Sequence, residues 1–246
     1  MKFSFEEKQL LKPFYTTNEL GRYFGQRKNK FWIIYTTSKY KDADLIKPYP
    51  NIKNHLDKFK TIMTSTNKPY GLHRSRQEII FKDEKILSLR KCSEKPTFTY
   101  TNFDTYVNRT FLIIKTQRIN NKFLTAILNS KVIAFWLKHK GKMQGTNYQV
   151  DKNPLLGLPL NKPNKSISGK LISLSSKIIN SKEIIADYTV LLEKAKSENN
   201  IKKEIKLSKI LEKLNNDINS FEEIIDHMIY QSYGLSPMDV HLIEND

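Results

Sequence analysis

Arginine, lysine and histidine side chains gather in one stretch of the sequence, from Tyr49 to Lys91. Such cations bind phosphate groups, and arginine also bonds the edge of guanine with two N–H groups. The stretch has the pattern of a short basic helix, a polar loop and short strands, which would hold the cations on a rigid frame. Its candidate contacts are His73, Arg74, Arg76, Lys85, Arg90 and Lys91. The pattern predicts a surface that binds phosphates and reads bases, although His73 fits an ordinary surface histidine equally well.

A second polar segment surrounds Gly145. Asparagine and glutamine bond adenine with two hydrogen bonds, and glycine gives a loop the freedom to enter a groove. The segment from Lys142 to Tyr148 supplies Gln144 and Asn147, and Gln149 follows it. We predict base contacts from this loop, with a structural role equally open for Tyr148. Further cations expected at phosphates are Lys12, Arg22 and Lys53.

Positive charge is concentrated in the first two thirds of the chain. The 246 residues carry a formal net charge of +17. Residues 1–160 hold 30 Lys and Arg against 12 Asp and Glu, whereas residues 161–246 hold 12 against 13. A merely lysine-rich composition would raise the charge of both parts, so the asymmetry favours a localised anion-binding surface. Nucleic acid is the partner that such a surface fits.

Sequence motifs for catalysis are absent. No GxGxxG or GxxxxGK[ST] loop occurs, and Asn153-Pro154-Leu155-Leu156 lacks the second proline and the aromatic residue of an amino-methylating DNA enzyme. Asp83-Glu84-Lys85 has the wrong spacing for a metal nuclease, and the histidines show no metal-ligand spacing. We predict no catalytic residue, metal site or cofactor in this chain. An unrecognised nuclease or methyltransferase activity is the alternative.

The single cysteine and the N-terminus bear on the compartment. Cys92 has no partner for an intrachain disulfide, so a cytoplasmic location is expected. The N-terminus, MKFSFEEKQL, has acidic residues where a signal peptide would be apolar. No apolar run approaches the roughly 20 residues of a membrane span. We therefore expect no membrane partner.

Hydrophobic patterns predict an α+β fold with several short strands and helices in the first part of the chain. A buried strand is expected over FWIIY (31–35) and an amphipathic helix over residues 51–63. A buried helix is expected over residues 122–139, followed by an extended segment over residues 153–160 that Pro163 closes. Further strands are expected at residues 78–81, 85–90, 97–100 and 111–116. The aromatic residues expected in the core are Trp32, Phe111, Phe135 and Trp136.

The last part of the chain carries two heptad stripes. One runs from Ile167 to Leu192 and the other from Leu207 to Met228, and SENN (197–200) separates them. Sustained heptads predict an antiparallel, coiled-coil-like pair of helices, with packing of each helix on the first domain as the alternative. We predict two domains, residues 1–163 for the α+β part and residues 164–246 for the helical hairpin.

The order of several short motifs resembles one protein family. The segment LKPFYTTNELGRYF, followed by FWIIY, resembles the start of the specificity region in TaqI-like and Eco57I-like adenine-specific DNA methyltransferases. This group includes the fused type IIG restriction-modification enzymes. The same order continues with YPNIKNHLDKFK, KPYGLHRSR, IIFKDEKILSLR, FLIIKT and FLTAILNSKVIAFW, and the usual end of such proteins resembles IIDHMIYQSYGLSPMDVHLIE. The residues that match the shared framework are Lys12, Pro13, Arg22, Tyr23, Tyr49, Pro50, Phe81, Lys85, Ile86, Asn129, Ser130, Gly145 and Tyr148.

This resemblance implies a target recognition domain over residues 1–163 that reads a sequence in duplex DNA within a bacterial restriction-modification system. Such a domain helps to hold the DNA while an adenine is flipped into a catalytic domain. The methyltransferase or nuclease domain, with S-adenosylmethionine and magnesium, is expected as a partner outside this chain. Base-contacting residues vary in the family, so no recognition sequence is implied. The alternatives are a coiled-coil interaction module and a nonspecific nucleic-acid-binding protein.

Overall fold

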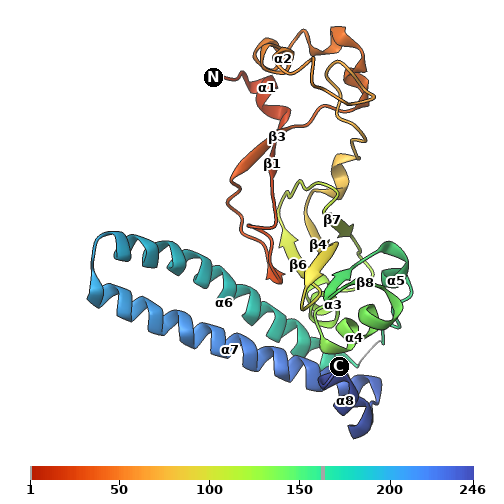
Figure 1. The fold of residues 1–246 in the computed structure, drawn as a ribbon, viewed down its shortest axis with the longest axis vertical. Coiled ribbons are helices and arrows are strands. Elements are labelled where there is room, and N and C mark those ends of the chain that lie inside the picture. Colours follow the sequence, from red (N-terminus) through yellow and green to blue (C-terminus); the bar gives the residue numbers. More distant parts are fainter. Residues whose placement is uncertain (1, 162–163) are drawn as a thin grey trace. The chain divides into compact units, whose positions relative to one another are not determined.

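The computed structural model describes residues 2–161 and 164–246, which form two compact units (Figure 1). The N-terminal unit contains the residues up to Thr16, Lys28–Asp83 and Phe103–Val107. The C-terminal unit contains Thr17–Arg27, Glu84–Asn102 and the described residues from Asn108 to Asp246. Neither unit is therefore a continuous stretch of sequence. The domain boundary that we expected at Pro163 lies outside the described residues.

A two-stranded ribbon and several short helices build the N-terminal unit. Strands β1 (Leu11–Phe14) and β3 (Phe31–Ile34) pair antiparallel. The helices are α1 (Phe5–Gln9), α2 (Pro50–Asp57) and the 3-10 turns η1 (Ser38–Lys41), η2 (Ala43–Ile46) and η3 (Glu78–Ile80). A small core of Tyr40, Ile46, Ile52 and Tyr70 holds these turns together.

A buried carboxylate fixes the start of α2. Glu7 accepts hydrogen bonds from the backbone N–H groups of Asn51 (2.7 Å) and Ile52 (3.3 Å) and from the Asn51 amide (2.9 Å). These N–H groups have no partner within the helix, so the carboxylate takes the place of a helix cap. Burial raises the pKa of Glu7, but the hydrogen bonds from Asn51, Ser4 and Ile52 together lower it by more. The pKa of Glu7 therefore lies below its ordinary value.

Three predictions for this unit are wrong. The helix expected over residues 51–63 ends at Asp57. The strand expected at residues 78–81 is the turn η3, where Glu78 accepts a hydrogen bond from the Tyr106 hydroxyl and pairs with Lys12. Trp32 was expected in the core but is 64% exposed. At η3, contacts of Glu78 with residues distant in the sequence override the local apolar pattern.

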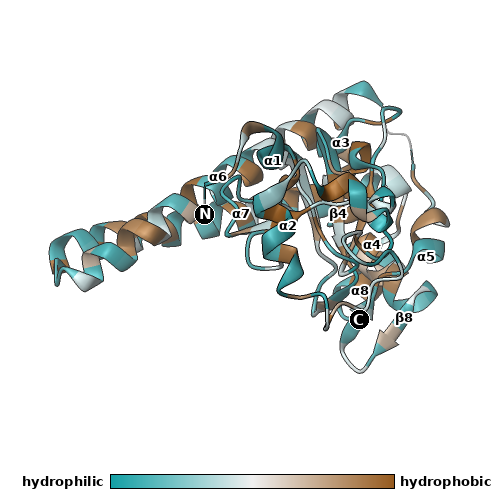
Figure 2. Ribbon diagram, turned by 90° about the horizontal axis from the view of Figure 1, so that it is seen from above, coloured by the Kyte–Doolittle hydropathy of each residue, from teal (hydrophilic) through white to brown (hydrophobic). Residues whose placement is uncertain are grey.

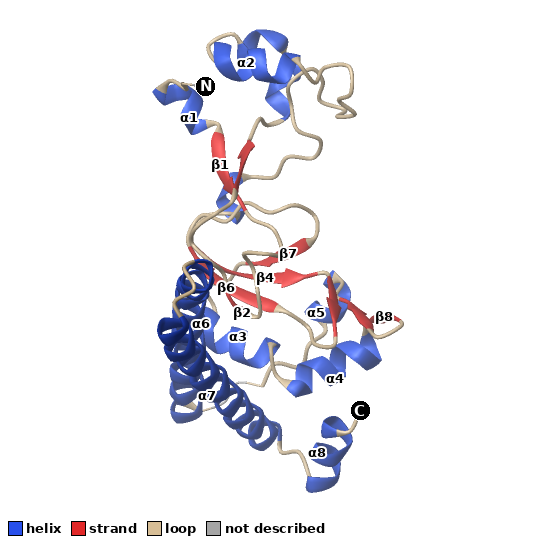
Figure 3. Cartoon of the chain, turned by 60° about the vertical axis from the view of Figure 1, so that its left-hand side comes forward, coloured by secondary structure: helices blue, strands red, loops and turns tan. Residues whose placement is uncertain are grey.

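A four-stranded sheet forms the centre of the C-terminal unit (Figure 3). Its order is β2 (Tyr23–Phe24), β6 (Phe98–Asn102), β4 (Glu84–Leu89) and β7 (Phe111–Ile114). β2 runs parallel to β6, and the other pairs are antiparallel. Helix α3 (Asn121–Leu128) packs on the sheet, and its Phe123 and Ile127 join the same core as Ile86 and Phe98. The strands predicted at residues 85–90, 97–100 and 111–116 are confirmed.

The single helix predicted over residues 122–139 is two helices, α3 and α4 (Lys131–Lys140). Asn129 lies at the break, where its side-chain amide donates to the Phe98 carbonyl (2.8 Å) and its side-chain oxygen accepts from the Phe98 N–H (3.1 Å). Ser130 then caps α4 by accepting a hydrogen bond from the Ile133 N–H. An apolar periodicity continues through this break and gives no sign of it.

A three-stranded sheet of order β5–β9–β8 lies in the same unit. Its strands are β5 (Lys91–Ser93), β8 (Lys142–Gln144) and β9 (Asn147–Gln149). The polar loop predicted around Gly145 is thus a hairpin, with Gly145 at φ +61° in its two-residue turn, a conformation that glycine adopts freely. Helix α5 (Lys152–Leu156) replaces the start of the extended segment expected at residues 153–160.

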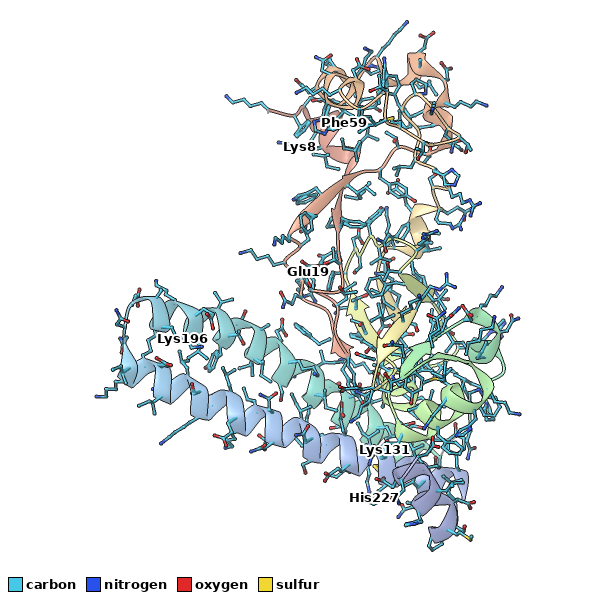
Figure 4. The ribbon with its side chains drawn as sticks, viewed as in Figure 1. Lys8, Glu19, Phe59, Lys131, Lys196 and His227 are labelled. Atoms are coloured by element: carbon cyan, nitrogen blue, oxygen red, sulfur yellow. The ribbon has the colours of Figure 1, made fainter. Side chains whose placement is uncertain are left out.

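Two long helices, α6 (Lys165–Ser197) and α7 (Ile201–Tyr233), lie side by side as the predicted antiparallel pair (Figure 1). Apolar residues recur along both helices (Figure 2), and Lys196 lies near the free end of the pair (Figure 4). The other end joins the sheet, because Leu171, Ile178 and Ile225 belong to its core. Gly234 at φ +64° ends α7, and α8 (Pro237–Glu244) follows. The α+β fold with a helical hairpin is confirmed.

Among the described residues, no helix combines the length and the apolar character that crossing a bilayer requires.

Candidate nucleic-acid interface

The sheet β5–β9–β8 presents a polar face, which is built from two rows of side chains. Its register aligns one row of Lys91, Gln149 and Lys142 and another of Ser93, Asn147 and Gln144. Because alternate residues of a strand project to the same side, both rows share one face. All of these side chains except Gln149 are well exposed. The polar face therefore combines two cations for phosphates with two exposed amides, those of Gln144 and Asn147, that suit the edge of adenine.

The opposite side of this sheet is buried. Cys92, Tyr148 and Met143 are aligned across the three strands, and all three pack in the core of the C-terminal unit. Burial raises the pKa of the Cys92 thiol and that of the Tyr148 hydroxyl. Tyr148 thus takes the structural role that the sequence left open, since its ring anchors the sheet from behind.

Arg90 and Asp151 attach the polar face to the rest of the unit. The Arg90 guanidinium pairs with Asp151 at 2.8 Å, and the Gln149 amide donates to the same carboxylate at 3.1 Å. The backbone of Arg90 also donates to the Thr110 carbonyl and accepts from the Val150 N–H. The hydrogen bond from Arg90 holds the pKa of Asp151 below its ordinary value. Arg90 therefore helps to position the strands, while its side chain stays 39% exposed, and the DNA contact predicted for it stays a prediction.

In the N-terminal unit, the candidate cations lie on the segment Tyr70–Arg76, here called the arginine loop. The residues after β3 hold both of its ends. The Thr36 hydroxyl donates to the Tyr70 carbonyl, and the Leu72 N–H donates to the Thr36 carbonyl. The Tyr35 hydroxyl donates to the Arg76 carbonyl (2.6 Å) and accepts from the Arg76 N–H (2.8 Å). The loop is thus fixed by its backbone, and its side chains are left for other contacts.

The side chains of His73, Arg74 and Arg76 are exposed. His73 lies 3.2 Å from the Thr66 hydroxyl, and Arg74 has φ +57°, a conformation uncommon outside glycine. Within residues 2–161 and 164–246, neither guanidinium forms an ion pair or a hydrogen bond. Two unpaired arginines on a fixed backbone match what base or phosphate recognition requires.

Arg22 was predicted at a phosphate, but the structure places it inside the C-terminal unit. Its guanidinium donates to Glu222 (3.1 Å), to the Pro96 carbonyl (3.1 Å) and to the side chain and carbonyl of Asn129. It therefore links α7 to the break between α3 and α4. Its donors are used within the fold, and we assign it a structural role.

Three predicted phosphate ligands are also engaged within the fold. Lys12 pairs with Glu78 at 2.9 Å, and Lys53 pairs with Asp57 at 2.8 Å. Lys85 is 0% exposed, so its ammonium group is out of reach of a phosphate. Of the predicted cations, Lys91, Lys142, Arg74 and Arg76 thus keep the exposure that a DNA contact needs.

A charged cavity of about 430 Å³ lies between the α3–α4 break, α7 and α8. Acidic side chains outnumber basic ones on its walls, which is unfavourable for a polyanion. Asp226 lies there, 7% exposed, and accepts a hydrogen bond from the Lys131 N–H at the start of α4 (2.8 Å). Burial raises the pKa of Asp226 to about 6. No group of His, Cys, Asp and Glu side chains in the described part of the chain is arranged to hold a metal ion.

Residues 40–160 match the TaqI-like C-terminal specificity domain. The chain is 26% identical over 129 residues to the type II methyltransferase M.HincII of Haemophilus influenzae, which covers 46% of this chain and 26% of the relative. It is also 25% identical over 175 residues to the type II methyltransferase M.HindII of the same species. This aligned segment covers 66% of this chain and 32% of the relative. The chain thus spans about a third or less of the length of these relatives.

The fold is similar to that of the type IIL restriction-modification enzyme MmeI, whose structure was solved in complex with DNA. The TM-score is 0.61 at 12% identity, and the match covers 94% of this chain and 29% of the other. At this identity the likeness concerns the fold alone.

Proposed function

Since residues 40–160 belong to the TaqI-like C-terminal specificity domains, we propose that this chain recognises a specific sequence in duplex DNA for a restriction-modification enzyme. The polar face of β5–β9–β8 is the observation that carries the proposal. The exposed amides of Gln144 and Asn147 and the lysines Lys91 and Lys142 lie on one face of this sheet, where they supply donors and acceptors for base edges and charges for phosphates. The aligned rows fix the spacing of these groups, which specific recognition needs.

The arginine loop supplies the second contact in this proposal. Arg74 and Arg76 have the planar donors that bond guanine bidentately, and His73 stands beside them. Phosphate neutralisation by these arginines and by Lys91 and Lys142 gives a log–log salt dependence with a slope of about −0.9 for each phosphate contacted. The predicted contacts of Lys12, Arg22, Lys53 and Lys85 do not form part of the proposal, because these side chains are paired or buried.

Catalysis belongs, in this proposal, to a separate methyltransferase or nuclease domain or subunit that uses S-adenosylmethionine and magnesium. The type II methyltransferase relatives, which are about three or more times longer than their matched part, support this division. Adenine as the methylated base, a type IIG arrangement and a bacterial, cytoplasmic setting complete the proposal. Methyl transfer or DNA cleavage by the isolated chain, assayed with labelled S-adenosylmethionine or with magnesium, would contradict the non-catalytic role.

Selection from a randomised duplex pool tests the recognition itself. The chain is immobilised at about 150 mM salt, a strength that screens surface charge over a Debye length of about 8 Å, and the retained DNA is sequenced. Enrichment of one short motif is expected. Retention of DNA without enrichment would contradict specific recognition by this chain, and no retention even at low salt would contradict DNA binding altogether.

A further inference from the structure

The ribbon β1–β3 carries two large aromatic side chains that the fold leaves in solvent. Trp32 is 64% exposed and Phe31 is 46% exposed. Tryptophan is usually well buried, because its ring gains the most from leaving water. Both residues precede the segment that matches the specificity domain, residues 40–160. Neither has a role in the contacts proposed above.

The register of the ribbon gives each face one exposed ring. Trp32 is opposite Pro13, and Phe31 is opposite Phe14. Because neighbouring residues of a strand project to opposite sides, the indole lies on one face and the phenyl ring on the other. The outer edge of β3 pairs with no strand among the described residues. The two-stranded ribbon thus has one exposed aromatic ring on each of its faces.

Cations flank these rings. Lys28 and Lys30 are exposed, and the Lys30 ammonium lies 5.6 Å from the centre of the Phe31 ring. Neither lysine forms an ion pair within the part of the chain that the structure describes. The Asn29 amide donates to the Phe31 carbonyl (2.6 Å) and shapes the turn that presents them. Aromatic rings flanked by cations are the combination with which proteins bind nucleic acid, and lysine is depleted at the centre of protein–protein interfaces, so a polyanionic ligand with planar groups is favoured.

We propose that the Phe31–Trp32 edge of the ribbon is a sequence-independent DNA contact, in which Trp32 inserts at a base step of the duplex and stacks on the base that it unstacks, while Lys28 and Lys30 neutralise the adjacent phosphates. Aromatic rings accept every base as a stacking partner, so the contact adds affinity without reading sequence. This inference rests on the proposed DNA-binding function but places a site outside the polar face and the arginine loop. The Trp32 contact would thus contribute to the affinity for DNA of any sequence.

Fluorescence isolates this contact, because the chain has two tryptophans, Trp32 and Trp136. Trp136 donates its N–H to the Pro154 carbonyl within the C-terminal unit. In a Trp136→Phe variant, Trp32 is the single emitter, and quenching on addition of the selected duplex is expected. Unchanged Trp32 emission at saturating DNA would overturn the inference while leaving DNA recognition intact.

Affinity gives an independent test in the otherwise unaltered chain. Trp32→Ala is expected to weaken binding about 5- to 150-fold with the same enriched motif, which is the range for loss of one stacked base. Lys28→Gln and Lys30→Gln are each expected to make the slope of log affinity against log salt concentration less negative by about 0.9. Phe5→Ala, which removes another exposed aromatic ring of the N-terminal unit, is the matched control and should leave affinity unchanged.

The two hypotheses fail in different ways. Normal affinity of Trp32→Ala for the selected duplex would overturn this contact alone, whereas no DNA binding by the unaltered chain would overturn the proposed function as well. Trp32 emission that responds to an added methyltransferase domain but not to DNA would overturn the DNA contact in favour of a protein interface.

Discussion

Arg74 and Arg76 differ from Arg22 in what their guanidinium groups contact. Those of the arginine loop make no ion pair among the described residues, whereas the donors of Arg22 are used by Glu222, Pro96 and Asn129. Residue type alone does not separate these roles, because all three residues are arginines. The separation comes from the partners that the fold brings to Arg22 from positions 74 to 200 residues away in sequence.

At the arginine loop, Arg74→Ala and Arg76→Ala should each cost about 1–3 kcal/mol in binding to the selected sequence and relax the preference at one base position. The physical reason is the loss of a bidentate contact to a base edge. Competition binding against single-base variants of the selected duplex measures both effects. Arg109→Ala, at an exposed position, is the control. An equal loss on every sequence would instead identify these arginines as phosphate contacts.

Arg22→Ala should lower the free energy of unfolding by about 3–5 kcal/mol, because Glu222 and the Asn129 carbonyl would be left without their charged partner in a mostly buried site. Urea unfolding measures the change, and the exposed Arg109→Ala should stay within about 0.5 kcal/mol of the unaltered chain. A fully stable Arg22→Ala variant with weakened DNA binding would restore the phosphate role that we first predicted.

Helices and strands could be predicted from the sequence where apolar residues repeat regularly within one continuous segment. The heptads of α6 and α7 and the apolar strands β4 and β7 gave the right structures. The break at Asn129 could not, because it depends on hydrogen bonds to Phe98, 31 residues earlier in the chain. The exposure of Trp32 depends likewise on the tertiary structure, since the fold leaves this ring uncovered although it lies in an apolar strand.

For the polar face, the sequence indicated several of the residues but not the strand pairing that brings them together. Gln144 and Asn147 were identified as a flexible loop, yet they lie on a hairpin paired with β5. This pairing brings Lys91 and Ser93 beside them across more than fifty residues of sequence. The alternation of polar and buried residues in KCS, KMQ and NYQ is the signal for it, but runs of three residues are too short to identify strands.

Asp226 makes the joint between α7 and α4 sensitive to pH. Burial raises its pKa, which outweighs the lowering by the Lys131 N–H and by the charges of Arg22 and Lys131, and Glu222 raises it further. The folded pKa of about 6 lies above the ordinary 3.8, so the folded state holds this proton more tightly than the unfolded state. The stability that the proton confers is therefore present below about pH 4 and is lost as the pH rises to about 6.

Asp226→Asn should remove this pH dependence and raise the free energy of unfolding at neutral pH by up to about 3 kcal/mol, since the amide oxygen can still accept from the Lys131 N–H. Urea unfolding between about pH 4 and 8 measures it, with the exposed Glu223→Gln on the same helix as the control. An identical pH profile in Asp226→Asn and the unaltered chain would contradict the raised pKa.

For the whole molecule, each compact unit carries its own candidate contact with DNA. The N-terminal unit presents the arginine loop and the aromatic ribbon edge, and the C-terminal unit presents the polar face. The excess of cations in residues 1–160 covers both units, whereas the α6–α7 pair is nearly neutral. Sequence recognition on this account needs the polar face, and the other contacts add affinity or read further positions.

The most direct test of the central claim compares DNA selection by the unaltered chain with selection by the double variant Gln144→Ala and Asn147→Ala, which removes the two exposed amides of the polar face. The unaltered chain is expected to enrich one motif, and the variant is expected to retain DNA through its cations but to lose the preference at one or more positions of that motif. Enrichment of the same complete motif by both proteins would contradict a reading role for the polar face.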